Sequence, residues 1–160
     1  MRLALVCVGK LKAGPERLLF DRYLKRLREG ARSAGLVGVD FREIGESRAR
    51  RPDERRAEEG AAIQAAVARG AALVLLDERG PSVTSEEWAA DIGRARDRST
   101  PAYAVAIGGP DGLDQSLGAA AHRAVSFGAM TWPHQLVRVM AAEQLYRAMT
   151  ILAGHPYHRR

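Results

Sequence analysis

The sequence contains little cysteine and no long apolar run, and both absences narrow the class of protein. Cys7 is the single cysteine among 160 residues, so a disulfide within the chain is impossible. The longest uninterrupted apolar runs, such as Leu3–Val8, have six residues, whereas a membrane-spanning helix needs about 20. Lys10 and Lys12 end the first run too soon for a secretory signal, and no cleavage pattern follows it. We therefore expect a cytoplasmic protein without a membrane partner.

Sequence repeats and extreme composition are absent as well. No Gly-X-Y, heptad or longer period recurs, which excludes collagen-like, coiled-coil and repeat folds. Hydrophobic residues make up 46% of the chain and charged residues 28%, as in ordinary globular proteins. A chain of this length predicts a single domain that spans residues 1–160.

The positive charge is carried mainly by arginine. The net charge is +6, and every basic residue except Lys10, Lys12 and Lys25 is an arginine. Guanidinium groups suit phosphates and stack on bases, so a polyanionic partner is one interpretation and a solvated basic surface is the other. The segment 48–56 contains five arginines and has the same two interpretations, contact with RNA phosphates or a mobile surface loop.

Apolar segments of strand length alternate with segments of helical period, a pattern typical of a parallel sheet with crossover helices. The expected strands are Leu3–Val8, Leu36–Phe41, Ala72–Leu76, Ala102–Ile107 and Ala124–Phe127. The expected helices include one that opens at Pro15 and is stopped by Gly30, one over 52–69, one that begins near the capping pair Thr84 and Glu87, and one over about 133–153. The pattern therefore predicts an α/β fold with a mostly parallel sheet and helices on both faces.

The last expected helix is apolar all round. Its helical wheel places Leu136, Val139, Met140 and Ile151 on one side and Val137, Leu145, Met149 and Leu152 on the other. The sheet of so small a domain covers one side, and a second copy of the chain most simply covers the other. We therefore expect a homodimer that packs through this helix.

Three loops that follow expected strands form the candidate ligand site, because open parallel sheets bind ligands beyond the carboxyl ends of their strands. These loops are 76–81, 107–112 and 128–133. The middle loop has neither G-x-G-x-x-G spacing nor a Lys-Ser/Thr pair, which argues against a dinucleotide or ATP. A ligand without phosphate, held by backbone groups and apolar contacts, fits better. The alternative for each glycine cluster is a tight turn without a ligand.

The C-terminal third contains two further groups of polar residues. The tail 154–160 combines hydrogen-bond donors with one aromatic ring, which suits an unstacked base and its phosphate; a frayed basic terminus is the alternative. Glu143 and Arg147 have the spacing of either a structural ion pair or a pair that orients a substrate. All four histidines follow residue 121, but they lack zinc-site spacing and a nearby cysteine, so we expect no metal.

Five motifs spread over the chain form a specific combination. They are LDERG at 76–80, IGGPDGL at 107–113, MTWPHQLVRV at 130–139, EQLYRA at 143–148 and HPYHR at 155–159. Together they closely resemble the ribosomal RNA large subunit methyltransferase H family, most specifically in the C-terminal third. Two departures are modest: Pro81 replaces a lysine that is common in the family, and Arg160 extends the terminus by one residue.

The resemblance implies an S-adenosylmethionine-dependent enzyme of the SPOUT class. Such an enzyme would be a homodimer that methylates the ring N3 of a pseudouridine in 23S rRNA within the assembled 70S ribosome. The resemblance also implies a C-terminal trefoil knot, which general rules for chain connections would not predict. The methyl donor would contact Leu76, Gly108, Gly109, Phe127, Gly128, Ala129, Met130, Thr131 and Trp132. The catalytic group would comprise Glu143, Arg147, Tyr157, His158 and Arg159.

Two other functions are consistent with parts of the sequence. A non-catalytic ribosome-binding or assembly protein could use the same basic surface, and binding of S-adenosylmethionine distinguishes it from the enzyme. A nucleotide-dependent oxidoreductase of doubly wound fold is disfavoured, because the dinucleotide fingerprint is missing.

Overall fold

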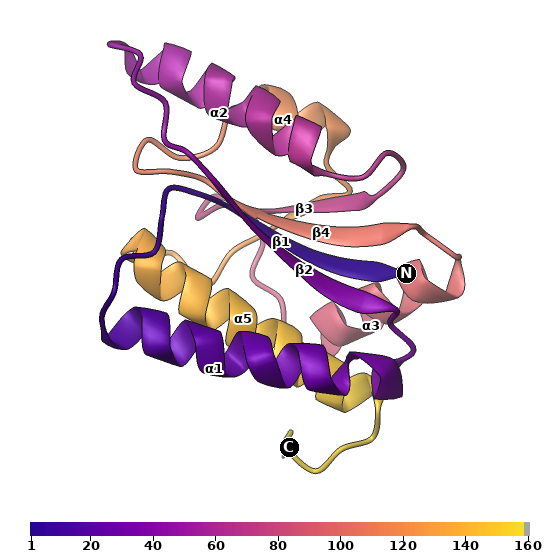
Figure 1. Ribbon diagram of the computed structural model, residues 1–160. Coiled ribbons are helices and arrows are strands. Elements are labelled where there is room, and N and C mark those ends of the chain that lie inside the picture. Colours follow the sequence, from indigo (N-terminus) through magenta and orange to yellow (C-terminus); the bar gives the residue numbers. More distant parts are fainter. Residues whose placement is uncertain (159–160) are drawn as a thin grey trace.

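A computed structural model describes residues 1–158 of the chain (Figure 1). It contains a five-stranded sheet of order β2-β1-β4-β3-β5 in which every neighbouring pair is parallel. The strands are β1 (Arg2–Val8), β2 (Gly38–Ile44), β3 (Ala72–Leu76), β4 (Ala102–Ile107) and β5 (Arg123–Val125). The helices are α1 (Pro15–Gly30), α2 (Pro52–Ala66), α3 (Ser85–Asp97), α4 (Ser116–Ala120) and α5 (His134–Leu152), with a 3-10 turn η1 (Ala31–Ala34) after α1. The predicted α/β fold is confirmed.

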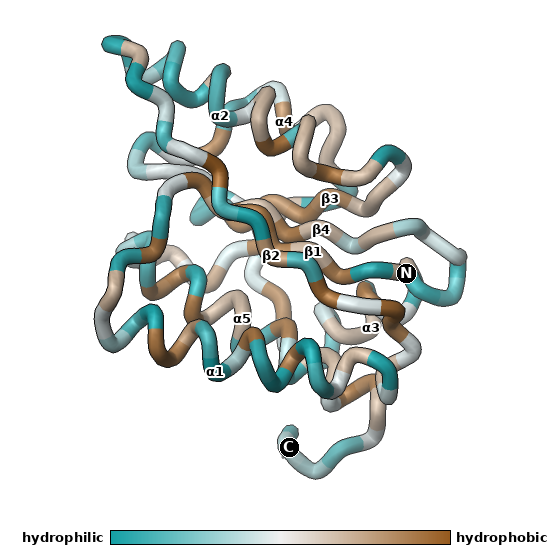
Figure 2. The backbone as a smooth tube through the Cα atoms, viewed as in Figure 1, coloured by the Kyte–Doolittle hydropathy of each residue, from teal (hydrophilic) through white to brown (hydrophobic). Residues whose placement is uncertain are grey.

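Helices cover both faces of the sheet. Figure 1 shows α1, α3 and α5 on one face and α2 and α4 on the other. Successive strand residues point to opposite faces, so Leu5 and Cys7 of β1 join the core under α1, α3 and α5, whereas Val6 and Val8 join the core under α2 and α4. Figure 2 shows brown apolar segments concentrated along the strands and the inner sides of the helices. None of the helices within residues 1–158 is both long and apolar enough to cross a membrane.

Several boundaries match the prediction, and each has a local cause. Pro15 opens α1, and its fixed φ is already helical. Thr84 caps α3: its hydroxyl accepts from the N–H of Glu87 at 3.1 Å, and the Glu87 carboxylate accepts from the N–H of Thr84 at 2.8 Å. Strands β3 and β4 have the predicted bounds.

The second strand was predicted too early in the chain. Residues 31–37 instead form η1 and its cap, where Gly35 adopts φ +74° and the N–H of Leu36 donates to Ala31 O at 3.0 Å. The strand then begins at Gly38 and continues to Ile44, because it pairs with β1 along its whole length, from Arg2 to Val8.

Two further boundaries were wrong by a few residues. Helix α2 ends at Ala66 instead of Arg69, since Val67 takes an extended backbone (φ −88°, ψ 135°), which suits a β-branched side chain. Strand β5 ends at Val125 instead of Phe127 because the Ser126 hydroxyl turns the chain, donating to Gly128 O at 2.9 Å and accepting from Gly128 N at 3.1 Å.

Most of the apolar surface of α5 is covered within the chain. Helix α5 packs between α1 and α3 against the sheet, so that Val139, Leu145 and Met149 are buried. Leu136 at its start remains 38% exposed. Of the predicted side formed by Leu136, Val139, Met140 and Ile151, only Val139 is buried, so the expectation that a second chain covers this side stays a prediction. The homodimer itself stays a prediction.

Candidate active site

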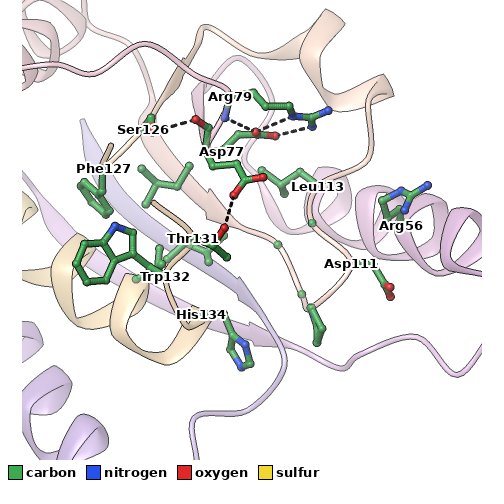
Figure 3. Close-up of a pocket in the computed structure, with 18 of the residues that line it drawn as sticks. Arg56, Asp77, Arg79, Asp111, Leu113, Ser126, Phe127, Thr131, Trp132 and His134 are labelled. Carbon is green, nitrogen blue, oxygen red and sulfur yellow. Dashed lines mark hydrogen bonds and ion pairs between the residues drawn. The ribbon is translucent and has the colours of Figure 1, made fainter. Parts of the chain in front are cut away.

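A cleft of about 780 Å³ lies at the carboxyl ends of β3, β4 and β5 (Figure 3). Residues 76–79, 107–115 and 125–132, except Ala129, line it, together with Asp53 and Arg56 of α2 and His134 and Val137 of α5. These segments follow parallel strands, so the sheet brings the three glycine-containing loops to one edge. All of the predicted donor-binding residues line this cleft except Ala129. Their contact with a donor stays a prediction.

Glycine is required at Gly108 because two backbone segments meet there. A Cβ at this position would lie 2.8 Å from the carbonyl carbon and 2.9 Å from the oxygen of Gly112. The loop folds back on itself, and the N–H of Gly112 donates to Gly109 O at 3.0 Å. Gly112 has φ +85°, a left-handed conformation that favours glycine. At Gly108 and Gly112, the loop therefore places backbone without a side chain beside the cleft.

Hydrogen bonds connect the loop after β3 with the loop after β5. The Thr131 hydroxyl lies 3.3 Å from a carboxylate oxygen of Glu78, and the Ser126 hydroxyl lies 3.2 Å from Glu78 O (Figure 3). A Cβ on Gly80 would lie 3.0 Å from Val125 N, so the two segments also pack backbone to backbone. The two loops therefore form one continuous wall of the cleft.

Asp77 is held in its ionised form at this wall. Arg79 donates to it through Nε at 3.0 Å, through Nη2 at 2.9 Å and through its backbone N–H at 2.9 Å. The Arg79 side chain lowers the pKa of Asp77 more than partial burial raises it. Because Arg79 is paired in this way, it is not free to neutralise a phosphate. On this wall, residues 76–79 and 125–132 therefore leave no free guanidinium for a phosphate.

The predicted catalytic residues form a second group beside α5. Arg147 Nη2 donates to Glu143 Oε1 at 2.5 Å, and the Tyr157 hydroxyl donates to the same oxygen at 3.0 Å. The Arg147 guanidinium lies 4.9 Å from the centre of the Tyr157 ring. His158 Nε2 lies 2.9 Å from Glu86 Oε1, and its Nδ1 lies 3.5 Å from Arg147 Nη1. The described part of the tail is therefore folded against α5 and not frayed.

Electrostatics keep Tyr157 and Arg147 of this group protonated. Burial, followed by hydrogen bonds involving Tyr23 and Glu143, raises the pKa of Tyr157, so the phenol stays protonated at neutral pH. The hydrogen bond to Glu143 raises the pKa of Arg147 further above its ordinary range. Glu143 and Arg147 thus form the ion pair that their spacing allowed. Arg159, the fifth predicted member, lies outside the described residues.

The two groups are separate within one chain. None of Glu143, Arg147, Tyr157 and His158 lines the 780 Å³ cleft. Along α5, Glu143 lies six positions beyond Val137, the last residue of this helix that lines the cleft, which corresponds to about 9 Å at about 1.5 Å per residue. Glu143 instead lines a smaller groove of about 580 Å³, which α1, α3 and α5 share with the loop around Phe127. In Figure 1 the tail leaves α5 at the end farther from the carboxyl ends of the strands.

The sequence interpretation missed two buried charged residues near the cleft. Arg138 of α5 is completely buried, and its Nη2 donates to Val8 O. Glu59 of α2 is 4% exposed, and a Cβ on Gly109 would lie 3.0 Å from its Oε2. An arginine inside an apolar helix is a signal that could have indicated the buried Arg138. The sequence around Glu59 has the polar pattern of an exposed helix, so it gave no indication that Glu59 is buried.

Comparison with known proteins gives a family model and relatives that are all named as methyltransferases. A family model described as predicted SPOUT methyltransferase matches residues 1–158. A protein named ribosomal RNA large subunit methyltransferase H from Methylocella silvestris is 57% identical over 99% of each chain. Its namesake from Rhodopseudomonas palustris strain HaA2 is 58% identical over the same share of each chain.

One solved structure shows a more distant likeness. It is the SpoU methyltransferase AviRb from Streptomyces viridochromogenes, in complex with the cofactor AdoMet. The match covers 90% of this chain and 56% of that chain, with 14% identity and a TM-score of 0.40. This likeness is too weak to say anything about function.

Proposed function

Since the chain belongs to the SPOUT methyltransferases, within the ribosomal RNA large subunit methyltransferase H family, we propose that it methylates the ring N3 of a pseudouridine in 23S rRNA. The methyl donor is S-adenosylmethionine, and the substrate is the assembled 70S ribosome. The family also implies a trefoil knot in the C-terminal part of the fold. The observation that supports the proposal most directly is the cleft, whose lining residues coincide with the donor contacts expected from the family motifs.

The residues of the cleft fit this donor. The tight approach at Gly108 leaves backbone groups facing the cleft, which suits hydrogen bonding to an adenosine and an amino-acid group. Leu76, Ile107 and Val125 supply apolar contact at the strand ends. The donor carries cationic sulfonium and ammonium groups, and Glu78 and Asp114 are carboxylates that line the same cleft. The site thus offers what a zwitterionic ligand without phosphate requires.

The reaction sets two requirements for the chain's own residues. S-adenosylmethionine supplies an electrophilic methyl carbon on a sulfonium sulfur. The ring nitrogen must be aligned with that carbon and must lose its proton. Arg147, held by Glu143, provides a fixed positive charge that favours the deprotonated imide. His158 or a water molecule accepts the proton, and Tyr157 orients the base together with the rest of the tail.

A second copy of the chain brings the two groups together. Because the Glu143 group does not line the cleft of its own chain, it acts at the cleft of a partner. Several large apolar side chains are exposed near the starts of α1 and α5, a surface that suits a second copy: Leu18, Leu19, Met130, Trp132 and Leu136. Sedimentation at micromolar concentration is expected to give the mass of two chains, and a single-chain mass would contradict this part of the proposal.

Methylation of ribosomes tests the proposed activity directly. We expect purified protein with S-adenosylmethionine to modify 70S ribosomes that lack the modification, and mass spectrometry of 23S rRNA to locate the methyl group on N3 of one pseudouridine. Naked RNA fragments should be poor substrates, because so small a protein relies on the shape of the ribosome for selection. Deletion of residues 155–160 should abolish transfer while calorimetry still detects donor binding. A protein that shows no heat of donor binding would instead be the non-catalytic ribosome-binding alternative.

A further inference from the structure

We propose that Arg48, Arg50 and Arg56 form a docking surface for phosphates of the substrate RNA at the rim of the cleft. This inference rests on the proposed function, since it names the part of the protein that receives the same RNA. It concerns the arginine-rich segment 48–56, whose role the catalytic proposal leaves open.

The five arginines of this segment fall into two classes. Arg51 and Arg55 are paired: Arg51 lies 2.7 Å from Asp53, and Arg55 makes two hydrogen bonds to Asp111, of 2.6 and 3.0 Å. Arg48, Arg50 and Arg56 have no carboxylate within 4.0 Å among residues 1–158. Arg56 acts on Asp111 and Asp114 only through space, as one of the charges that lower the pKa of each. Three guanidinium groups are therefore left for an external anion.

The paired residues give the segment a defined shape. Arg55 Nη1 donates to the carbonyl oxygens of Ala49 and Arg50 at 3.1 and 3.0 Å. The N–H of Ser47 donates to Glu59 Oε1 at 2.9 Å, and the Ser47 hydroxyl donates to Glu58. Residues 47–51 have no regular secondary structure, yet they are tied to α2 at several points. The alternative of a mobile surface loop is therefore disfavoured, and a preordered loop loses less entropy when it binds.

The position of the segment connects it to the cleft. Arg56 lines the cleft, and Figure 3 shows it beside Asp111, on the side opposite Phe127 and Trp132. Arg48 and Arg50 are exposed on the strand-to-helix loop just before α2. Figure 1 places this loop at the same end of the molecule as the carboxyl ends of the strands. An RNA segment with one base at the cleft would therefore pass close to these side chains.

The chemistry favours phosphate contact at short range. A free guanidinium fork binds phosphate oxygens in pairs. Asp53 and Glu54 lie in the same segment and Glu58 lies just beyond it on α2, so carboxylates offset part of its charge and the arginines do not act as a broad positive field. We therefore expect a small number of direct arginine–phosphate contacts. Loss of each contact makes the slope of log K against log salt shallower by about 1.

A pair of charge-matched variants tests the proposal. The test variant is R48Q/R50Q/R56Q, and the control is R32Q/R69Q/R98Q, which removes the same charge from exposed positions at the opposite, amino-terminal edge of the sheet. Binding to 70S ribosomes is measured over a series of salt concentrations, with donor affinity measured by calorimetry. We expect the test variant to bind ribosomes at least about 10-fold more weakly, with a slope of log K against log salt shallower by about 2. The control should stay within about 2-fold of wild type. Donor affinity should be unchanged in the control and in R48Q/R50Q, which keeps the cleft-lining Arg56.

Other outcomes would overturn the proposal or separate it from the proposed function. An equal loss of ribosome affinity in the test and control variants, or no loss in either, would show that these three arginines have no special role. A wild-type protein that does not bind ribosomes would overturn the proposal as well. R48K/R50K/R56K retains the charge and should recover part of the affinity, which shows that a loss in the glutamine variant is not due to misfolding. If wild-type protein binds ribosomes and the test variant does not, but neither transfers a methyl group, the docking surface stands and the proposed activity fails.

Discussion

Arg138 of α5 donates a hydrogen bond through Nη2 to the carbonyl oxygen of Val8, the last residue of β1. The same side chain is fully buried, and its Nη1 lies 3.4 Å from Glu43 on β2. A cation near the start of α5 is thereby tied to the carboxyl ends of two strands. Because residues 127–132 lead directly into α5, this contact also positions one wall of the cleft.

Replacement of Arg138 by methionine is expected to destabilise the fold. The substitution keeps most of the side-chain volume but leaves Val8 O and Glu43 without their buried partner, and loss of one partner of a buried pair typically costs about 3 kcal/mol. Urea unfolding measures the loss. R98M, at an exposed position, should change the unfolding free energy by less than about 0.5 kcal/mol. Equal effects of the two substitutions would contradict the role given to Arg138.

The close backbone approach at Gly108 predicts a loss of donor binding in G108A. The added Cβ would meet backbone atoms of Gly112 below 3.0 Å, so the loop must move. We expect the affinity for S-adenosylmethionine to fall at least about 10-fold, a loss of roughly 1.4 kcal/mol. Calorimetry with G118A is the control, because no described residue comes within 4 Å of a Cβ at Gly118, and an alanine inside α4 should stabilise slightly. Unchanged donor affinity in G108A would place the donor elsewhere.

The buried carboxylate of Asp91 should make the free energy of unfolding depend on pH under acidic conditions. Burial alone would raise its pKa, but hydrogen bonds from Tyr103, His122 and Arg94 outweigh burial and lower the pKa below the ordinary 3.8. A depressed pKa contributes stability that is fully present above the unfolded value and is lost as pH falls toward the folded value. Wild-type protein should therefore lose stability below about pH 4 more steeply than D91N. Parallel stability curves for the two proteins between pH 5 and pH 3 would rule this contribution out.

A mixing experiment tests the division of the active site between two chains. G108A supplies an intact tail with a damaged cleft, and the variant lacking residues 155–160 supplies an intact cleft without a tail. Mixed after unfolding and refolding, they should form heterodimers with one complete site. At a donor concentration well below what G108A needs for binding, random pairing should return about a quarter of wild-type methylation, although each variant alone is then nearly inactive. A mixture no more active than its components would mean that each chain uses its own tail.

Regular elements could be predicted well wherever local signals were strong. Strands β3 and β4 are apolar runs, Pro15 opens α1, and Thr84 with Glu87 caps α3, so each boundary is encoded by a few neighbouring residues. Boundaries failed where a distant contact decided them. Pairing with β1 moved the second strand, and a side-chain turn at Ser126 ended the fifth.

The candidate site, like the regular elements, could be predicted from the sequence only in part. The glycine loops after the strands could be predicted to meet at one edge, because parallel strands place their carboxyl ends together. The separation of the Glu143 group from the cleft could not be predicted, since it depends on where α5 lies and on how the tail folds back to Glu143 and Glu86. The roles of the arginines in segment 48–56 could not be predicted either, because Asp111 pairs with Arg55, whereas Arg56 has no direct carboxylate contact among residues 1–158.

By itself, the amino-acid sequence determined the fold class, the loops that meet at the cleft and the family, since these depend on periodicity and on motifs of adjacent residues. Tertiary structure alone decided which charges are buried, which arginines are paired and which catalytic candidates share a surface. The physical reason is that burial and ion pairing depend on distances between atoms, and packing sets those distances for residues far apart in the chain.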